Sequence, residues 1–160
     1  MKKIQLALIL FLNLYFSLGA QEEVKLQKYQ EEILKLVNAQ RMKGCQCGAS
    51  IYPPVHPLRW NKRLENAAEI QVKYLAKNSK LSHLGQEGSN VRARLDKANY
   101  IWKSYAENIA EGYDSSFEVF DAWIKSPGHC KNIMGNFIEM AVVKSGDYWV
   151  QDFASPKSEQ

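Results

Sequence analysis

Apolar side chains recur at spacings of three and four residues in three stretches, which predicts amphipathic helices over 29–43, 62–78 and 115–125. The stripes are Ile33, Leu34, Val37 and Met42 in the first, Leu64, Ala67, Ala68 and Leu75 in the second, and Phe117, Phe120, Trp123 and Ile124 in the third. Each stripe is wide enough to bury one helix face against a common core.

The ends of these helices carry recognisable signals. Asn61 can cap the second helix, and Ser115 with Glu118 resembles a capping box at the start of the third. Pro127-Gly128 is expected to stop the third helix, after which residues 129–134 can add one more turn.

The stretches between the helices are expected to be irregular. Pro53, Pro54 and Pro57 forbid a regular helix in the first of them. These stretches are residues 45–59, 79–89 and 99–114, with a short basic helix over 90–98 between the last two.

The last part of the chain changes period. Residues 137–144 and 148–153 are apolar and rich in strand-forming side chains, and Ser145-Gly146-Asp147 separates them, which predicts a β-hairpin. Helices followed by a hairpin indicate an α+β domain with a small antiparallel sheet. We expect one domain over 21–160, with its core at about 29–154.

Residues 1–20 have the composition of an export signal. Lys2 and Lys3 precede an apolar run over 6–12, and small residues follow at 17–20. The run is shorter than the about twenty residues of a membrane span, although an uncleaved segment could serve as an anchor. We therefore expect a secreted or periplasmic protein that contacts a membrane only if this segment is retained.

Charge changes the picture little. The signal removes two of the 21 basic side chains and none of the 17 acidic ones, so the net charge falls from +4 to +2. The remaining charges are evenly spread, which argues against nucleic acid or an anionic membrane as a partner.

Three cysteines, Cys45, Cys47 and Cys130, suggest one disulfide and one spare thiol in an exported chain. A Cys45–Cys47 bridge would close a small strained ring, so we favour Cys47–Cys130, with Cys45–Cys130 as the second choice. A zinc site formed by the three cysteines and His129 is a further alternative, although C-x-C spacing is tighter than the usual C-x2-C.

Candidate chemistry is carried by His83, Glu107 and His129, which we expect to meet in one cleft. Two imidazoles and a carboxylate can bind zinc or another divalent cation, or act as an acid–base set. Each residue could instead hydrogen-bond its own loop. Ser82 and Ser126 lie close to these histidines in sequence, but neither is in a nucleophile elbow, so no catalytic nucleophile is evident. Further residues expected to line the cleft are Gln71, Ser82, Asn108 and Ser126.

Gln71 has a second interpretation. It is a polar residue on an otherwise apolar helix stripe, and its amide could find a backbone partner instead of lining a cleft.

Taken together, several ordered motifs resemble the CAP superfamily of cysteine-rich secretory, antigen 5 and pathogenesis-related proteins, and most closely its compact bacterial SCP-domain branch. The motifs are Leu36-Val37-Asn38-x-x-Arg41, Pro57-Leu58-Arg59-Trp60-Asn61, Leu64-x-x-Ala67-Ala68, Ser82-His83-x-Gly85, Glu107-Asn108-Ile109-Ala110, Trp123-x-x-Ser126-Pro127-Gly128-His129-Cys130-x-Asn132-Ile133-Met134 and Tyr148-Trp149-Val150-Gln151-Asp152-Phe153. They cover nearly all of the chain that follows the signal.

The resemblance implies an α/β/α sandwich around a small central antiparallel sheet. It also implies a cleft in which His83, His129 and Glu107 match the family's two histidines and first glutamate. The second glutamate is replaced by Ser126, and Gln71 stands where the bacterial branch often has histidine. Both departures weaken the case for a metal.

Family resemblance does not decide function. We favour a binding or interaction module for a small apolar or extracellular ligand, or for a protein partner, over an enzyme. One alternative is a peptidase-like hydrolase that uses a metal-bound or His/Glu-activated water. Another is a structural surface-interaction domain with a vestigial cleft.

Overall fold

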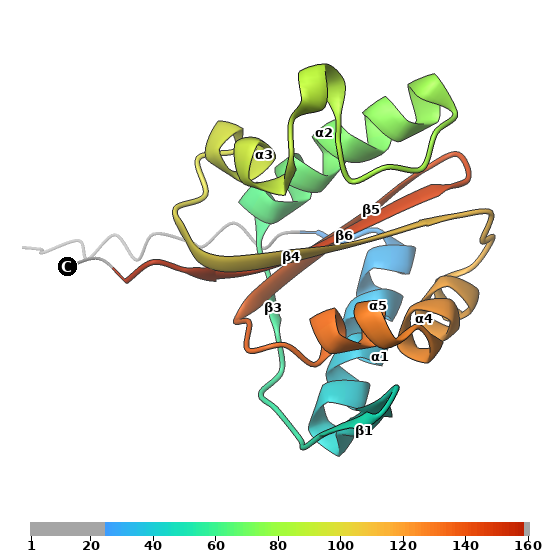
Figure 1. Ribbon diagram of the computed structural model, residues 1–160, viewed down its shortest axis with the longest axis vertical. Helices are drawn as coiled ribbons and strands as arrows, with labels where there is room; N and C mark the ends of the chain where they lie inside the picture. The colour runs from blue at the N-terminus through green and yellow to red at the C-terminus, as the bar shows by residue number, and fades with distance from the viewer. Residues whose placement is uncertain (1–24, 159–160) are drawn as a thin grey trace, which may run out of the picture.

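The computed structural model describes residues 25–158 and arranges them in three layers, with a sheet between two layers of helices (Figure 1). The predicted signal segment lies outside these residues. Within the described part of the chain, no helix is long and apolar enough to cross a membrane. The expected α/β/α arrangement of an α+β domain is confirmed.

The central sheet has the strand order β3-β5-β6-β4. Its strands are β3 (Arg59–Trp60), β4 (Trp102–Glu111), β5 (Glu139–Ser145) and β6 (Tyr148–Pro156). β5 and β6 form the expected hairpin, β4 pairs antiparallel with β6, and the short β3 pairs parallel with β5. β4 is therefore an edge strand with one side of its backbone unpaired by the sheet.

Two helices cover one face of the sheet and three cover the other (Figure 1). The first face carries α2 (Lys62–Asn78) and α3 (Val91–Lys97), joined through the 3-10 turn η1 (Gln86–Gly88). The second carries α1 (Lys28–Lys43), α4 (Ser116–Lys125) and α5 (Pro127–Ile133).

Each face of the sheet has its own apolar core. Strand side chains alternate between the faces, so neighbouring residues contribute to different cores. Between the sheet and α1, α4 and α5 lie the largest side chains, including Trp123, Trp149 and Phe153. The core beneath α2 is mainly aliphatic and includes Ala68, Val72 and Val150.

Two of the predicted irregular stretches contain strands. The prediction for 99–114 is wrong because β4 occupies most of it, and pairing with β6 outweighs its mixed polar sequence. The prediction for 45–59 is wrong in part. That stretch includes the hairpin of β1 (Cys45–Cys47) and β2 (Ser50–Tyr52), and its prolines lie just beyond the hairpin.

Three details of the predicted helices also differ. Phe117 is 67% exposed and Met42 is 57% exposed, so neither belongs to its core stripe, and Val119 is buried in α4 instead. Pro127 does more than end α4: it occupies the first turn of α5, where a missing N–H costs nothing.

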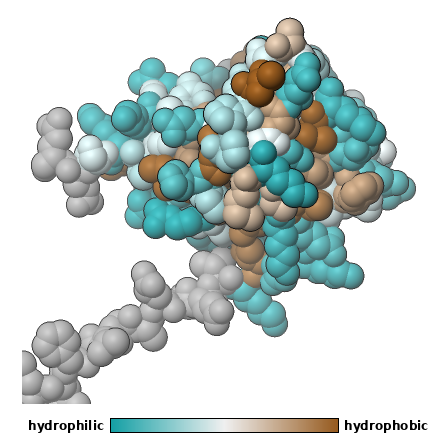
Figure 2. Space-filling view, turned by 90° about the horizontal axis from the view of Figure 1, so that it is seen from below, coloured by the Kyte–Doolittle hydropathy of each residue, from teal (hydrophilic) through white to brown (hydrophobic). Residues whose placement is uncertain are grey.

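The hairpin end of the molecule carries exposed apolar side chains, among them Met42 and Ile51. Viewed from this end, apolar spots are separated by hydrophilic side chains (Figure 2). This face therefore shows no single large apolar patch of the kind that marks a stable protein interface.

Candidate functional site

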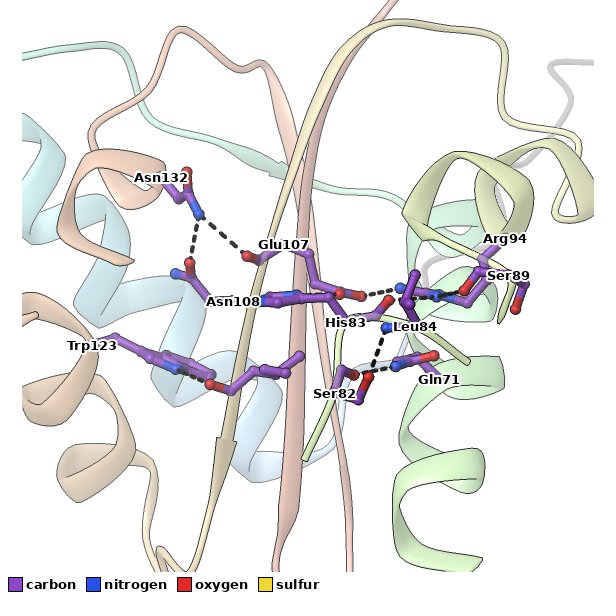
Figure 3. A network of polar contacts seen from close by, with 11 residues as sticks. Gln71, Ser82, His83, Leu84, Ser89, Arg94, Glu107, Asn108, Trp123 and Asn132 are labelled. Atoms are coloured by element: carbon purple, nitrogen blue, oxygen red, sulfur yellow. Dashed lines mark hydrogen bonds and ion pairs between the residues drawn. The ribbon is translucent and has the colours of Figure 1, made fainter. Parts of the chain in front are cut away.

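The site is organised around two adjacent residues of the edge strand β4, Glu107 and Asn108. Because neighbouring strand residues point to opposite faces, Glu107 faces the layer of α2 and α3, while Asn108 faces α5. Both are buried, and each is hydrogen-bonded to its own layer (Figure 3). This pair thus connects both helical layers to one edge of the sheet.

Glu107 holds the centre of the first half-site. Its Oε2 lies 2.5 Å from Arg94 Nη2, and both side chains are only 1% exposed. Its Oε1 accepts a hydrogen bond from Nδ1 of His83 at 2.8 Å. Since an ionised carboxylate can only accept, His83 donates from Nδ1, and in the neutral imidazole Nε2 is left as an acceptor. The His83 side chain is 55% exposed, so this acceptor is accessible.

The loop that carries His83 is held by hydrogen bonds from two buried side chains, Gln71 and Arg94. Gln71 on α2 is fully buried and donates from Nε2 to the carbonyl oxygen of Ser82 at 2.6 Å. Arg94 Nη1 donates to the His83 carbonyl at 3.3 Å. A Cβ at Gly85 would lie 2.6 Å from Gln71 Oε1, which explains the glycine of the Ser82-His83-x-Gly85 motif.

A second buried carboxyl group lies beside Glu107. Asp152 on β6 is paired with Glu107 in the β4–β6 ladder, so both side chains are on the same face. Asp152 is completely buried, and its oxygens have no hydrogen-bond partner among the described residues. Burial, and then the charge of Glu107, raise the pKa of Asp152 well above its usual range. The site therefore favours the protonated form of Asp152 more than water does.

Asn108 organises the second half-site. Its Nδ2 donates to the His129 carbonyl at 3.3 Å and to Gln151 Oε1 at 3.0 Å. Its Oδ1 accepts from Asn132 Nδ2 at 2.8 Å, and the same Asn132 amide donates to the Glu107 carbonyl. These bonds fix α5 against β4 and so set the position of His129.

His129 borders a groove of about 250 Å³ beside β4. The walls are mainly apolar, and the residues that line it are Leu81, Ile109, Ala110, Glu111, Tyr113, Ala122, Trp123, Ser126 and His129. Burial, and to a lesser degree the charge of His83, lower the pKa of His129. Its imidazole is therefore neutral at pH 7 and can both donate and accept one hydrogen bond.

A larger hollow of about 370 Å³ lies at the start of α2, away from the histidines. Charged side chains, among them Lys62, Arg63 and Glu139, line it. It contains none of the predicted site residues, so we place the candidate site at the groove beside β4.

The three predicted site residues are only partly brought together. His83 and Glu107 are in direct contact, whereas His129 lies on the other side of β4 and forms no hydrogen bond or ion pair with Glu107. Ser126 lines the groove beside β4. Gln71 and Asn108 have no exposed surface, so they support the cleft rather than line it. Ser82 Oγ accepts from the backbone N–H of Leu84, within its own loop.

A divalent metal fits this arrangement poorly. One Glu107 oxygen is paired with Arg94 and the other is hydrogen-bonded to His83, so both already have partners. Among residues 25–158, the group whose ligand atoms lie within 4.8 Å of one another is Cys45, Cys47 and Cys130, and two of these form a disulfide. Metal binding by His83, Glu107 and His129 remains a prediction.

Two buried charged residues of the site have no role in the sequence interpretation. Arg94 lies with Val91, Leu95 and Ala98 at the spacing of a helix stripe. A charged residue on an otherwise apolar helix face is the sequence feature that could have indicated its buried role. Asp152 is an acid inside an apolar strand, which is a similar signal. Neither spacing says that the two meet at Glu107.

The cysteines form the Cys47–Cys130 disulfide, the first of the two pairings considered from the sequence. The bridge joins the β1–β2 hairpin to α5, across a sequence separation of 83 residues. By the loop-entropy estimate, such a bridge stabilises the fold by about 4–5 kcal/mol. Cys45 is the free cysteine of the described chain.

Comparison with known families gives one match, to the family described as CAP, the cysteine-rich secretory protein family, over residues 34–153. Among curated proteins, Bacillus subtilis YkwD is 28% identical over 128 residues, which cover 78% of this chain and 46% of the relative. The B. subtilis membrane protein YlbC is 22% identical over 125 residues, covering 78% and 34%. The chain thus spans less than half the length of these relatives.

Solved structures share the fold. An extracellular SCP-domain protein of Bacillus anthracis superposes with a TM-score of 0.68 at 21% identity, covering 79% of this chain and 40% of that one. An outer surface protein of Borrelia burgdorferi gives a TM-score of 0.63 at 20% identity, covering 81% and 90%. At this identity the likeness concerns the fold alone.

Proposed function

Because the chain belongs to the CAP family of cysteine-rich secretory proteins, we propose that it is an extracytoplasmic binding module for a small, largely apolar molecule. The observation that carries this proposal is the groove beside β4, whose mainly apolar lining also includes the polar side chains of His129, Ser126 and Glu111. An apolar hollow with a few convergent polar groups is the usual form of a small-molecule site.

The size of the groove limits the ligand. About 250 Å³ holds roughly eight non-hydrogen atoms, at the roughly 30 Å³ that a water molecule occupies in the liquid. This is too small for a whole membrane lipid, but it fits a short alkyl chain or a single ring. The groove therefore favours a small molecule, or one small group of a larger one.

The charges around the groove further restrict the kind of ligand that can bind. His129 is neutral at pH 7, and the nearby Glu111 carboxylate would repel an anionic head group. A bound molecule should thus carry an uncharged hydrogen-bonding group, such as a hydroxyl or an amide, next to its apolar part. His129 and Ser126 can each donate to and accept from such a group.

The extracytoplasmic setting is supported by three observations. The first twenty residues have the composition of an export signal. Structural neighbours include an extracellular protein and an outer surface protein. A disulfide also persists best in an oxidising compartment, and this chain forms one.

A titration with octanol tests the proposal. Octanol matches the volume and the uncharged head group that the groove calls for, and octanoate is its anionic counterpart. Amide NMR shifts of Ile109 and Ala110, and the indole N–H of Trp123, which donates to the Ile109 carbonyl at 3.4 Å, report on the groove. We expect saturable shifts at these positions, with weaker binding of octanoate. Shifts that are absent, or that rise linearly everywhere, would count against it.

A second candidate is a His/Glu-dependent hydrolase, favoured by the alignment of Arg94, Glu107 and His83. A carboxylate that fixes the imidazole tautomer leaves Nε2 free to take a proton from water. Release of nitrophenol from a small ester, compared between the wild type and His83→Gln, tests this role. Equal rates would exclude it. Calorimetry with zinc, in the wild type and in His83→Ala with His129→Ala, tests the metal-assisted form.

If neither ligand binding nor hydrolysis is found, the remaining interpretation is a surface-interaction domain whose cleft is vestigial. The apolar side chains at the hairpin end are separated by hydrophilic ones, and their arrangement does not indicate a specific partner for such a domain (Figure 2).

A further inference from the structure

Three cysteine sulfurs lie together where the β1–β2 hairpin meets α5. Cys45 and Cys47 are two residues apart in a strand, so their side chains point to the same side, while Gln46 between them is exposed. Cys130 on α5 approaches from that side and is bonded to Cys47. Sγ of Cys45 lies 3.5 Å from Sγ of Cys130 and 3.6 Å from Sγ of Cys47.

Cys130 could therefore form a disulfide with either of two nearby cysteines, Cys47 or Cys45. In an extended strand, residues i and i+2 are about 6.6 Å apart at Cα, and a bridge between them would also close a very small ring. The alternative to the observed Cys47–Cys130 bond is therefore Cys45–Cys130, not Cys45–Cys47. Because Cys45 Sγ is about equally far from both bonded sulfurs, it lies beside the bond, and attack in line with the bond requires the Cys45 side chain to move toward the bond axis.

We propose that Cys45, Cys47 and Cys130 form a thiol–disulfide exchange centre. The Cys45 thiol loses its proton to solvent, and the thiolate attacks Sγ of Cys130. The Cys45–Cys130 bond forms while the Cys47–Cys130 bond breaks, and its electron pair leaves on Cys47, which takes up a proton. The step is an isomerisation, so it needs no oxidant or reductant.

The two isomers differ in which sulfur the solvent can reach. Cys47 is only 1% exposed, whereas Cys45 is partly exposed. Exchange thus moves the bridge to the more accessible sulfur and leaves the free thiol in the core. A small external thiol can then attack Cys45 in the exchanged isomer, although it has little access to Cys47 in the observed one. Cys45 is, in this proposal, the point at which small thiols reduce the bridge.

Burial raises the pKa of the Cys45 thiol. The fraction of thiolate is therefore small at neutral pH, and it increases under alkaline conditions. Exchange should be slow near pH 7 and should accelerate as pH rises. Because an external thiol also reacts as its thiolate, only the difference between the wild type and a variant without Cys45 at each pH reports on the exchange.

The pairing is tested first in Cys47→Ser. Trypsin cuts after Lys43, Arg59, Lys125 and Lys131, so residues 44–59 and 126–131 become separate peptides. After thiols are blocked with N-ethylmaleimide in acid, mass spectrometry shows whether the two peptides are joined. We expect Cys47→Ser to carry a Cys45–Cys130 bridge and no labelled cysteine. Two labelled cysteines in the folded variant would overturn the proposal.

The exchange itself is tested in Cys45→Ser, which keeps the observed disulfide and so does not depend on the folding of Cys47→Ser. The wild type and Cys45→Ser are each treated with a small excess of dithiothreitol. The amount of disulfide-linked peptide that remains is measured over time. We expect the wild type to be reduced at least several-fold faster at about pH 8, with the ratio falling at lower pH. Equal rates at every pH would overturn the proposal, whatever bridge Cys47→Ser forms.

Discussion

At the scale of single residues, the site depends on one buried ion pair. Arg94 and Glu107 are both almost fully buried, and their contact leaves the second Glu107 oxygen free to orient His83. Removing one member of such a pair strands a charge in the interior, which costs far more than losing a surface pair. The position of His83 therefore rests on Arg94, which does not contact the histidine side chain.

Replacing Arg94 with Met tests this dependence. The aliphatic volume is kept, but the Glu107 carboxylate loses its guanidinium, so we expect the free energy of unfolding to fall by about 3–5 kcal/mol. Arg92→Met, on the same helix, is the matched control. Arg92 is exposed, forms a 3.8 Å pair with Asp96 and lies 5.3 Å from the centroid of the Trp102 ring, so its loss should cost about 1–2 kcal/mol, less than the loss of Arg94. Urea unfolding measures both, and similar losses would refute the role of Arg94.

Asp152 gives a prediction about pH. Its pKa is raised by burial and by the charge of Glu107, so the folded protein holds a proton on this carboxyl up to a higher pH than the unfolded chain does. Folding then takes up a proton, and this residue's contribution to stability falls as pH rises above its unfolded pKa of about 3.9.

Asp152→Asn removes that titration while keeping the shape of the side chain. Relative to the wild type, the variant should gain stability as pH rises from about 4 to 8, by about 1–3 kcal/mol at the upper end. Thermal unfolding across this range provides the test. Stability curves that stay parallel would mean that Asp152 does not change its protonation on folding.

Sequence reasoning reached part of this site. His83 and Glu107 are 24 residues apart, and no local sequence pattern connects them. Their contact was therefore expected from the family motifs. Arg94 was missed because its role is set by contacts across layers. Cleft lining by Gln71 was expected, yet the structure shows the other interpretation, an amide bonded to a backbone carbonyl.

At the scale of elements, the position of α5 depends on β4. Asn108 donates to the His129 carbonyl and accepts from Asn132, so a single side chain connects the strand to both ends of this short helix. A helix of seven residues is not stable alone, so these contacts and the disulfide hold it.

Asn108→Ala should loosen α5 specifically. Loss of three buried hydrogen-bond partners should lower the free energy of unfolding by about 1–3 kcal/mol. Hydrogen–deuterium exchange should speed up over residues 127–133 and stay unchanged in α3. Asn66→Ala, at an exposed position on α2, is the control. Equal protection of α5 in the two variants would show that Asn108 does not hold it.

Elements with their own periodicity were predictable from sequence. The helices over 62–78 and 115–125 were expected within a residue of their observed bounds, since caps mark their starts. β4 was not, because an edge strand whose alternate residues face two different helical layers has no simple polar–apolar alternation. Its strand character comes from pairing with β6.

At the scale of the whole molecule, the two helical layers meet at the open edge of β4. One layer supplies His83 and Arg94, and the other supplies His129 and the groove. The disulfide then joins α5 to the hairpin at the far end of the second layer. The groove is thus bordered by parts of the chain that only the complete fold brings together.

The central claim is that this groove holds a small apolar molecule, and a blocked groove tests it most directly. Ala122 on α4 lines the groove, so Ala122→Trp should fill it, while Ala39→Trp places the same side chain on an exposed position of α1. The measurement is the dissociation constant of octanol, from NMR titration of both variants. We expect Ala39→Trp to bind like the wild type and Ala122→Trp to lose binding at least tenfold. Equal affinities in the two variants would contradict the account.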